Sequence, residues 1–173
     1  MSQPATKIFL IGFMGSGKSH WGPLWAKNTH LSFYDLDQQV EKSFRLSVQE
    51  IFEQHGEEKF REIERIQLRK FEAKKGFILS CGGGTPCYFD NMDWMKKQGL
   101  TIYLKTDPAQ ILERVMNEKE KRPLLKKVNT SELLFFIENK LAEREKFYTA
   151  AHHTLDTVSL QEDSLQQLLS GLN

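Results

Sequence analysis

The sequence predicts an α/β protein in which helices cover both faces of a parallel β-sheet. Its 173 residues, 39% of them hydrophobic, suffice for one domain with a complete core. Short apolar runs alternate along the chain with longer helical patterns, and strands separated by helices form parallel sheets. No internal repeat or low-complexity linker divides the chain, so residues 1–173 are expected to form a single domain.

The individual elements follow from this alternation. The strand-like runs are Lys7–Ile11, Leu31–Tyr34, Phe77–Ser80, Leu100–Leu104 and the weaker His153–Asp156. The helical segments lie at about 17–28, 37–45, 57–75, 88–98, 107–118, 130–149 and 161–171. Asp107 and Pro108 supply a helix cap and a first-turn proline. Gly76 and Gly99 each end a helix just before a strand, which supports the same order of elements.

Charge and composition exclude several classes of protein. Lys and Arg number 24 against 23 Asp and Glu, which argues against a disordered chain and against a dedicated nucleic-acid or membrane-surface binder. No stretch reaches the roughly 18 apolar residues of a membrane span, and the first apolar run is too short for a signal peptide. Two cysteines are too few for a disulfide framework. We therefore expect a cytoplasmic monomer with reduced thiols that binds small molecules, not nucleic acid or membrane.

A glycine-rich segment after the first strand carries the strongest functional signal. Residues 12–19, GFMGSGKS, fit the phosphate-loop pattern G-x-x-x-x-G-K-[ST], between a strand and a helix as its mechanism requires. Backbone N–H groups would surround the β-phosphate at the positive end of the helix. Lys18 would bridge the β- and γ-phosphates, and the Ser19 hydroxyl would bind Mg²⁺. The nucleotide-binding residues expected here are Gly12, Gly15, Ser16, Gly17, Lys18 and Ser19.

The acidic residues of the site are predicted at the end of the second strand. The sequence motifs of GTPases are absent, and the run 77–80 continues into Cys81 and Gly82 without a carboxylate. Asp35 and Asp37 close the run 31–34, and strand alternation would direct both to one side. One could then act on Mg²⁺ through water and the other on a substrate hydroxyl. Alternatively, Asp37 caps the following helix.

One arginine is predicted on the apolar side of the helix at about 130–149. Arg144 falls about 20° from Ile137 around the helix axis, within the stripe that Leu133, Leu141 and Tyr148 also occupy. A guanidinium directed inward needs an anionic partner, because burying it unpaired costs several kcal/mol. Either a ligand supplies that anion, or Arg144 makes an internal ion pair or extends to solvent.

Two further features suggest a binding site for an organic acid. Glu64 falls on the apolar face that Phe60 defines, and Arg61 lies three residues before it, close enough to pair. This pair could orient Arg61 toward a ligand carboxylate, or it could be a structural salt bridge. Gly82–Gly84 follow the third strand and place bare backbone where ligands bind in parallel sheets. We favour close approach of a substrate over a flexible turn.

The stretch 119–127 interrupts the apolar rhythm of the chain. Its sequence is KEKRPLLKK, which contains five basic residues and one acidic residue. A solvated surface segment explains such a run in most proteins. In a protein that binds phosphates, the alternative is a mobile cationic flap.

Taken together, these motifs resemble the shikimate kinases, relatives of the nucleoside monophosphate kinases. The resemblance covers nearly the whole chain in order, through the phosphate loop, Asp35-x-Asp37, Phe60-Arg61-x-x-Glu64, Gly82-Gly83-Gly84, Arg122-Pro123-Leu124-Leu125 and Arg144-x-x-x-Tyr148. It implies a three-layer P-loop kinase fold with a five-stranded parallel sheet in the order 2-3-1-4-5. It also implies a substrate-binding region at about 35–64 and a mobile lid at about 117–128. The implied activity is a transferase reaction of aromatic amino acid biosynthesis, the ATP- and Mg²⁺-dependent phosphorylation of the shikimate 3-hydroxyl.

The resemblance also assigns roles to individual residues. Asp37 would hold the ring hydroxyls and act as the base, with Lys18 and Arg122 as the other catalytic residues. The substrate carboxylate would bind Arg61 and Arg144, with Glu64 and Phe60 supporting Arg61. The remaining roles are the ring-lining glycines Gly82, Gly83 and Gly84, the metal-side residues Ser19 and Asp35, Arg122 on the phosphates and Arg114 against adenine.

Three other functions remain possible at this point. A gluconate-type sugar-acid kinase has the same fold and also binds a carboxylate, although the paired aspartates and three glycines favour a cyclic substrate. A nucleoside monophosphate kinase is disfavoured because no base-reading site is evident. A regulatory module that binds nucleotide without transferring phosphate is the third alternative, and the joint presence of Lys18, Ser19, Asp37 and Arg122 counts against it.

Overall fold

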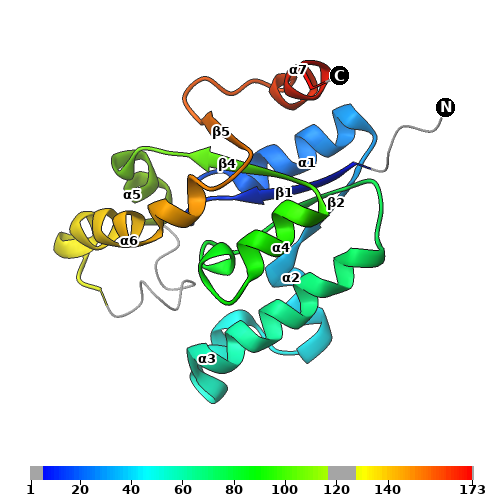
Figure 1. Cartoon of the computed structure of the whole chain (residues 1–173). Helices are drawn as coiled ribbons and strands as arrows, with labels where there is room; N and C mark the ends of the chain where they lie inside the picture. Colours follow the sequence, from blue (N-terminus) through cyan, green and yellow to red (C-terminus); the bar gives the residue numbers. More distant parts are fainter. Residues whose placement is uncertain (1–5, 117–127, 173) are drawn as a thin grey trace.

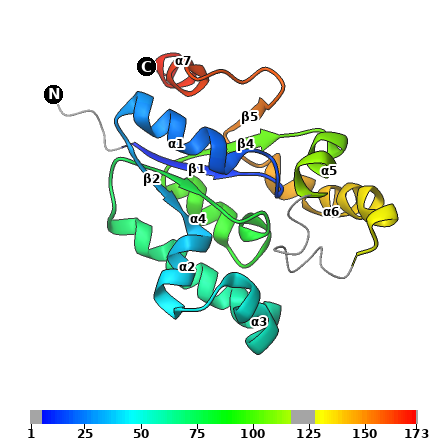
Figure 2. The ribbon, with the colours of Figure 1, turned by 180° about the vertical axis from the view of Figure 1, so that it is seen from behind.

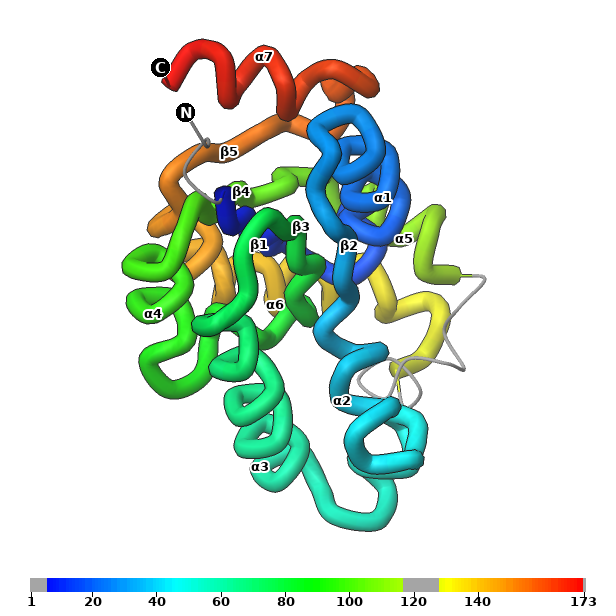
Figure 3. Tube along the Cα trace, turned by 90° about the vertical axis from the view of Figure 1, so that its right-hand side faces the viewer, coloured from blue at the N-terminus to red at the C-terminus, as the bar shows by residue number. Residues whose placement is uncertain are grey.

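The sheet of this protein is five-stranded and parallel. The structure, a computed structural model, describes residues 6–116 and 128–172. The strand order is β2-β3-β1-β4-β5, as the resemblance implied, and Figure 3 shows the sheet turned by 90° from the view of Figure 1. The predicted strands are confirmed to within one residue at each end. Their bounds are β1 (Lys7–Ile11), β2 (Ser32–Asp35), β3 (Phe77–Ser80), β4 (Leu100–Lys105) and β5 (His153–Asp156).

Burial along each strand explains its place in the sheet. In the central strand β1, Ile8–Ile11 are all fully buried, as expected of a parallel strand covered on both faces. The edge strand β5 alternates between half-buried and exposed residues, which is why its apolar signal in the sequence is weak. In the parallel register, Asp35 at the end of β2 lies beside Ser80 at the end of β3.

Helices cover both faces and make three layers, as predicted. Figures 1 and 2 show α1 and α7 on one face, with α3, α4, α5 and α6 on the other. The helices are α1 (Lys18–Thr29), α2 (Leu36–Phe44), α3 (Val48–Arg69), α4 (Asn91–Gln98), α5 (Pro108–Met116), α6 (Leu133–Tyr148) and α7 (Ser164–Ser170). Short 3₁₀ turns are η1 (Lys70–Ala73), η2 (Thr85–Cys87) and η4 (Thr130–Glu132).

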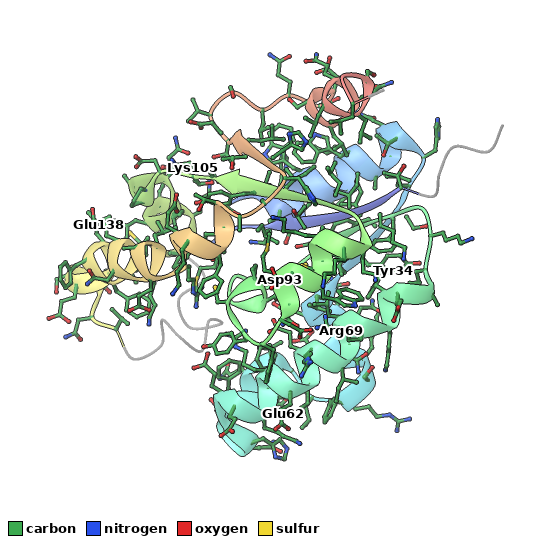
Figure 4. The ribbon with its side chains drawn as sticks, in the orientation of Figure 1. Tyr34, Glu62, Arg69, Asp93, Lys105 and Glu138 are labelled. Atoms are coloured by element: carbon green, nitrogen blue, oxygen red, sulfur yellow. The ribbon has the colours of Figure 1, made fainter. Side chains whose placement is uncertain are left out.

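Alternate side chains of the central strand build two separate cores. Ile8 and Leu10 pack with Trp25 of α1 and with Leu165 of α7. Phe9 and Ile11 belong to the larger core on the opposite face, which the other helices complete. Tyr34, labelled in Figure 4, lies edge-on against Phe71 in this second layer, with 5.3 Å between ring centroids. The rigid centre therefore holds the carboxyl ends of β1, β2 and β3 in fixed positions.

The structure corrects the prediction for the third helix. The sequence predicts a helix at about 57–75, whereas α3 begins at Val48, is interrupted at Gly56 and ends at Arg69. Ser47 and Glu50 form a capping box that starts the earlier stretch, a signal that the hydrophobic pattern does not contain. Gly56 has φ 79° and ψ 172°, so it breaks the helix just before the stretch that carries Arg61.

Two of the predictions fall partly or wholly outside the described residues. The predicted lid at about 117–128 lies outside the described residues except for Val128. The predicted catalytic residue Arg122 lies wholly outside them. In the ranges 6–116 and 128–172, no helix is both long and apolar enough to cross a membrane.

Candidate active site

The loops that follow β1, β2 and β3 meet at one edge of the sheet and enclose a cavity of about 280 Å³. Ligands of parallel sheets bind at this carboxyl edge, because helix N-termini and loops converge there. Five predicted nucleotide-side residues line this cavity: Gly15, Gly17, Lys18, Ser19 and Arg114. The other lining residues are Met14, His20, Asp35, Asp37, Ser80, Cys81, Gly82 and Gly83.

The phosphate loop has the local geometry that its sequence predicts. Gly15 has φ 76° and Gly17 has φ 94°, backbone conformations that residues with a Cβ rarely adopt. The Lys18 ammonium donates to the carbonyl oxygens of Gly12 at 2.7 Å and Phe13 at 2.9 Å. Gly12 and Ser16 therefore shape the loop without lining the cavity, whereas Gly15 and Gly17 do both.

Arg114 lies on the phosphate loop. From the last turn of α5, its Nη1 donates to the carbonyl oxygen of Gly15 at 2.9 Å. Its side chain thus lies beside the phosphate loop in the wall of the cavity, and its contact with adenine stays a prediction.

The two aspartates line the same cavity, but not in the way that strand alternation predicts. Asp35 is the last residue of β2 and also the N-cap of α2, and its carboxylate accepts from the Gln38 backbone N–H at 3.2 Å. Asp37 lies in the first turn of that helix. The capping role considered for Asp37 therefore belongs to Asp35, because the strand ends one residue later than predicted.

A second, smaller cavity of about 90 Å³ adjoins the first. Four residues line both: Met14, Asp37, Gly82 and Gly83. The remaining residues around the smaller cavity are Val48, Phe52, Phe60, Arg61, Glu64, Gly84 and Arg144. Asp37 therefore lies where the cavity at the phosphate loop meets a cavity that two arginines line.

Arg61 is buried and ion-paired on two sides. Its residue is 4% exposed, its Nη1 donates to Glu64 at 3.0 Å, and its Nη2 donates to Glu57 at 3.0 Å. Burial alone would lower the pKa of Arg61, but the charges and hydrogen bonds of Glu64 and Glu57 raise it. The structural salt bridge that the sequence allowed is thus present, and Arg61 still lines the smaller cavity.

Glu64 connects Arg61 to the glycine-rich loop. It is fully buried, and its second carboxylate oxygen accepts from the Thr85 hydroxyl at 2.6 Å. Thr85 is held in turn by Asn91, whose side-chain amide donates to the Thr85 carbonyl at 3.0 Å. This chain of contacts fixes α3 against the loop after β3.

Arg144 is as buried as predicted and is paired differently from Arg61. It lies on the buried face of α6 with Leu133, Ile137 and Tyr148, and it is 7% exposed. Among the described residues, no carboxylate oxygen lies within 4.0 Å of its guanidinium. The centroid of the Phe13 ring lies 5.4 Å from Arg144 Cζ, and the side chain of Tyr148 also interacts with the Arg144 guanidinium. A buried guanidinium beside a cavity, with no carboxylate partner among the described residues, favours an anion supplied from outside.

The three glycines are needed first of all for close approach by the protein's own side chains. A Cβ on Gly84 would overlap the Arg61 guanidinium, and one on Gly83 would lie 3.2 Å from Arg144 Nη1. On Gly82 it would lie 2.8 Å from Glu64 Oε1. The sequence argument for close approach is correct, but it attributed the approach to a substrate alone.

Several contacts of this region do not follow from the sequence patterns. Glu57 precedes Arg61 by four residues, a spacing that allows pairing on a helix, but the pattern of apolar residues indicates only Glu64 as a partner. Tyr148 donates its hydroxyl to the Gly83 carbonyl at 2.6 Å, which anchors the loop to α6. Thr85 lies in η2 and Tyr88 follows it, before α4 begins, so only the fold brings them to Glu64 and Arg61.

A phosphate loop after the central strand of a 2-3-1-4-5 sheet, next to a cavity that could hold an acceptor, defines a P-loop kinase. The family model for shikimate kinase matches residues 14–173. The chain belongs to the shikimate kinase family, which makes it a kinase with ATP as co-substrate. This membership decides against the gluconate-type and non-catalytic alternatives.

Individual relatives match over almost their whole length. Shikimate kinase of Phocaeicola vulgatus is 41% identical over 157 residues, which cover 91% of this chain and 90% of that protein. The crystal structure of shikimate kinase from Bacteroides thetaiotaomicron has a TM-score of 0.88 and 36% identity, covering 96% of this chain and 98% of that one. Shikimate kinase from Acinetobacter baumannii in complex with shikimate has a TM-score of 0.87 and 29% identity, covering 99% and 93%.

Proposed function

We propose that this shikimate kinase family member transfers the γ-phosphoryl group of ATP to the 3-hydroxyl of shikimate. The observation that carries the proposal is the pair of adjoining cavities, one at the phosphate loop and one at Arg61 and Arg144, with Asp37 lining both. A carboxylate held in the second cavity would leave the opposite edge of a ring facing the first. Positioning of this kind supplies much of the catalysis of phosphoryl transfer.

Arg61 and Arg144 are proposed to bind the substrate carboxylate. A planar carboxylate gripped by two guanidinium groups is fixed in position and in orientation. Both arginines line the smaller cavity, and Arg144 lacks a carboxylate partner among the described residues. Phe60 supports Arg61 through a ring contact, with Cζ 5.1 Å from the ring centroid. The substrate-binding region proposed at about 35–64 agrees with Val48 and Phe52 in the wall of this cavity.

Asp37 is proposed as the base and as a holder of the ring hydroxyls. It lines both cavities, so a hydroxyl bound at the shared wall could donate to its carboxylate while facing the phosphates. Gly82 and Gly83 belong to the same wall and would let the ring approach the backbone. Lys18 is proposed to stabilise charge on the transferred phosphoryl group. Arg122, outside the described residues, is proposed for the same purpose on its chemistry alone.

Magnesium is the proposed metal, with Ser19 and Asp35 as its protein-side residues. Both line the larger cavity and both offer oxygen atoms, the donor type that Mg²⁺ prefers. In the described ranges no group of three His, Cys, Asp or Glu side chains could hold a metal without help. This fits Mg²⁺, which commonly uses one or two protein oxygens together with phosphate and water. When bound, Mg²⁺ would neutralise charge on the phosphates.

A coupled ADP-release assay tests the proposal with four acceptors: shikimate, gluconate, a nucleoside monophosphate and water. We expect rapid ADP release with shikimate alone, and a product that carries its phosphate on the 3-oxygen by NMR. Release with gluconate in place of shikimate would refute the substrate assignment. Equal release without any acceptor would mean that the chain is an ATPase.

A further inference from the structure

Arg61 is held in place by two carboxylates of its own helix. Glu57 lies one turn before it and Glu64 one turn after it, so both can reach the guanidinium. Glu57 Oε1 accepts from Nε at 3.3 Å and from Nη2 at 3.0 Å, while Glu64 accepts from Nη1. Three of the five N–H bonds of Arg61 thus donate to these two carboxylates, and the Tyr88 side chain also interacts with the guanidinium.

Tyr88 completes this arrangement from a different part of the chain. It follows η2, and its hydroxyl donates to the same Glu57 oxygen at 2.9 Å. Its ring covers the Arg61 guanidinium, with Cζ 4.4 Å from the ring centroid. A cation so close to an aromatic face is attracted to it, and more strongly when it is desolvated, as Arg61 is.

The position of Glu57 depends on the break in α3. Gly56 leaves the helical conformation with φ 79°, so Glu57 begins the second helical stretch. Its side chain is 40% exposed, whereas that of Glu64 is fully buried. A half-exposed carboxylate would move readily without a second contact, and the Tyr88 hydroxyl supplies that contact.

We infer that Tyr88 and Glu57 are positioning residues that hold the Arg61 guanidinium with its terminal nitrogens toward the smaller cavity. The inference rests on the proposed function, because it concerns how Arg61 meets the substrate carboxylate. Neither residue lines that cavity, so both act through Arg61. Loss of the Tyr88–Glu57 hydrogen bond should therefore weaken binding of the acid and leave the nucleotide side unchanged.

The test compares Tyr88→Phe and Glu57→Gln with the wild type. Tyr88→Phe keeps the ring over Arg61 and removes one hydrogen bond, so the KM for shikimate should rise about three- to tenfold, the range that one hydrogen bond contributes. The KM for ATP and kcat should stay within twofold. Glu57→Gln should act in the same direction, which covers the case that one variant folds poorly.

Two controls separate positioning from a general structural effect. Tyr103→Phe removes another hydroxyl–carboxylate hydrogen bond, the 3.2 Å contact to Glu145, whose two residues line neither cavity, and should leave the KM for shikimate unchanged. With the carboxamide of shikimate as acceptor, the kcat/KM of Tyr88→Phe and wild type should agree within twofold, because no carboxylate then meets Arg61.

Three results would overturn the inference. An unchanged KM for shikimate in both variants would mean that Arg61 needs no positioning. A parallel rise in the KM for ATP would indicate a general structural role. A lower KM for shikimate would show that Glu57 competes with the substrate for Arg61. Failure of the wild type to phosphorylate shikimate would instead contradict the proposed function.

Discussion

The phosphate side and the acid side of this site are built in different ways. The phosphate side comes mainly from one contiguous segment, residues 12–19, whose glycine conformations and lysine contacts are local. The acid side combines α3, the loop after β3 and α6, which lie far apart in the sequence. A local motif needs only a strand and a helix to present it, whereas the acid side exists only when three elements pack correctly.

The two arginines of the acid side also differ. Arg61 is neutralised by Glu57 and Glu64, while Arg144 has no carboxylate partner among the described residues. Burial without a partner is costly, so Arg144 should contribute more of the attraction for an external anion. Arg61, with its fixed orientation, should contribute more to the direction in which that anion is held.

The largest expected effect on activity is that of replacing Asp37, which lines both cavities. Asp37→Asn should lower kcat by roughly 10²–10⁴, the usual contribution of a general base, and leave ATP binding nearly unchanged. Steady-state kinetics and nucleotide titration measure the two quantities separately. Asp93→Asn, on the exposed side of α4 (Figure 4), is the matched control. Turnover near the wild-type level would remove Asp37 from the chemistry.

Arg144→Ala should weaken the binding of shikimate and leave the binding of ATP unchanged. We expect a loss of about 2–5 kcal/mol in shikimate binding, with the affinity for ATP within twofold of wild type. Calorimetric titration with each ligand measures the difference, and Lys140→Ala on α6, where Lys140 pairs with Glu143, serves as the control. If shikimate affinity did not change, Arg144 would be a structural residue.

Gly84→Ala should disturb Arg61 through sterics. The added methyl group would overlap the guanidinium, so we expect a loss of about 1–3 kcal/mol in the free energy of unfolding and a higher KM for shikimate. Chemical denaturation and kinetics measure the two effects. Gly171→Ala, near the C-terminal end, adds the same methyl group with contacts no closer than 3.5 Å and should change neither value. A Gly84→Ala protein with normal stability would contradict the close packing.

The smallest expected effect concerns the pH dependence of the Glu57 pair. Partial burial opposes ionisation of Glu57, but hydrogen bonds from Tyr88 and Arg61 and the nearby positive charges lower its pKa below 4.5. A carboxyl with a lowered folded pKa stabilises the fold above its unfolded pKa, and this stability is lost as the pH falls through the folded value. Glu57→Gln should therefore cost less than about 1 kcal/mol at pH 7, since Glu57 is partly exposed.

Denaturant unfolding at pH 7 and at pH 3 checks this prediction. The difference in unfolding free energy between Glu57→Gln and wild type should be smaller at pH 3. A difference that grew toward acid pH would mean that the Glu57 pKa is raised instead.

The sequence alone was sufficient to predict the strands, the phosphate loop and which face of α6 is buried. These features depend on hydrophobic periodicity and on a contiguous motif, and both can be recognised within a short stretch of sequence. It was also sufficient to expect Glu64 and Arg144 on buried helix faces, as the structure has them. Local patterns determine which way a residue faces on its own helix.

Only the tertiary structure decided what those side chains meet. It brought Tyr88 to Arg61, gave the capping role to Asp35, and left Arg144 without a carboxylate partner among the described residues. It also showed that the glycines make room for arginine side chains. The physical reason is that ion pairs and close contacts depend on distances between elements, which arise from packing and from no pattern within a single element.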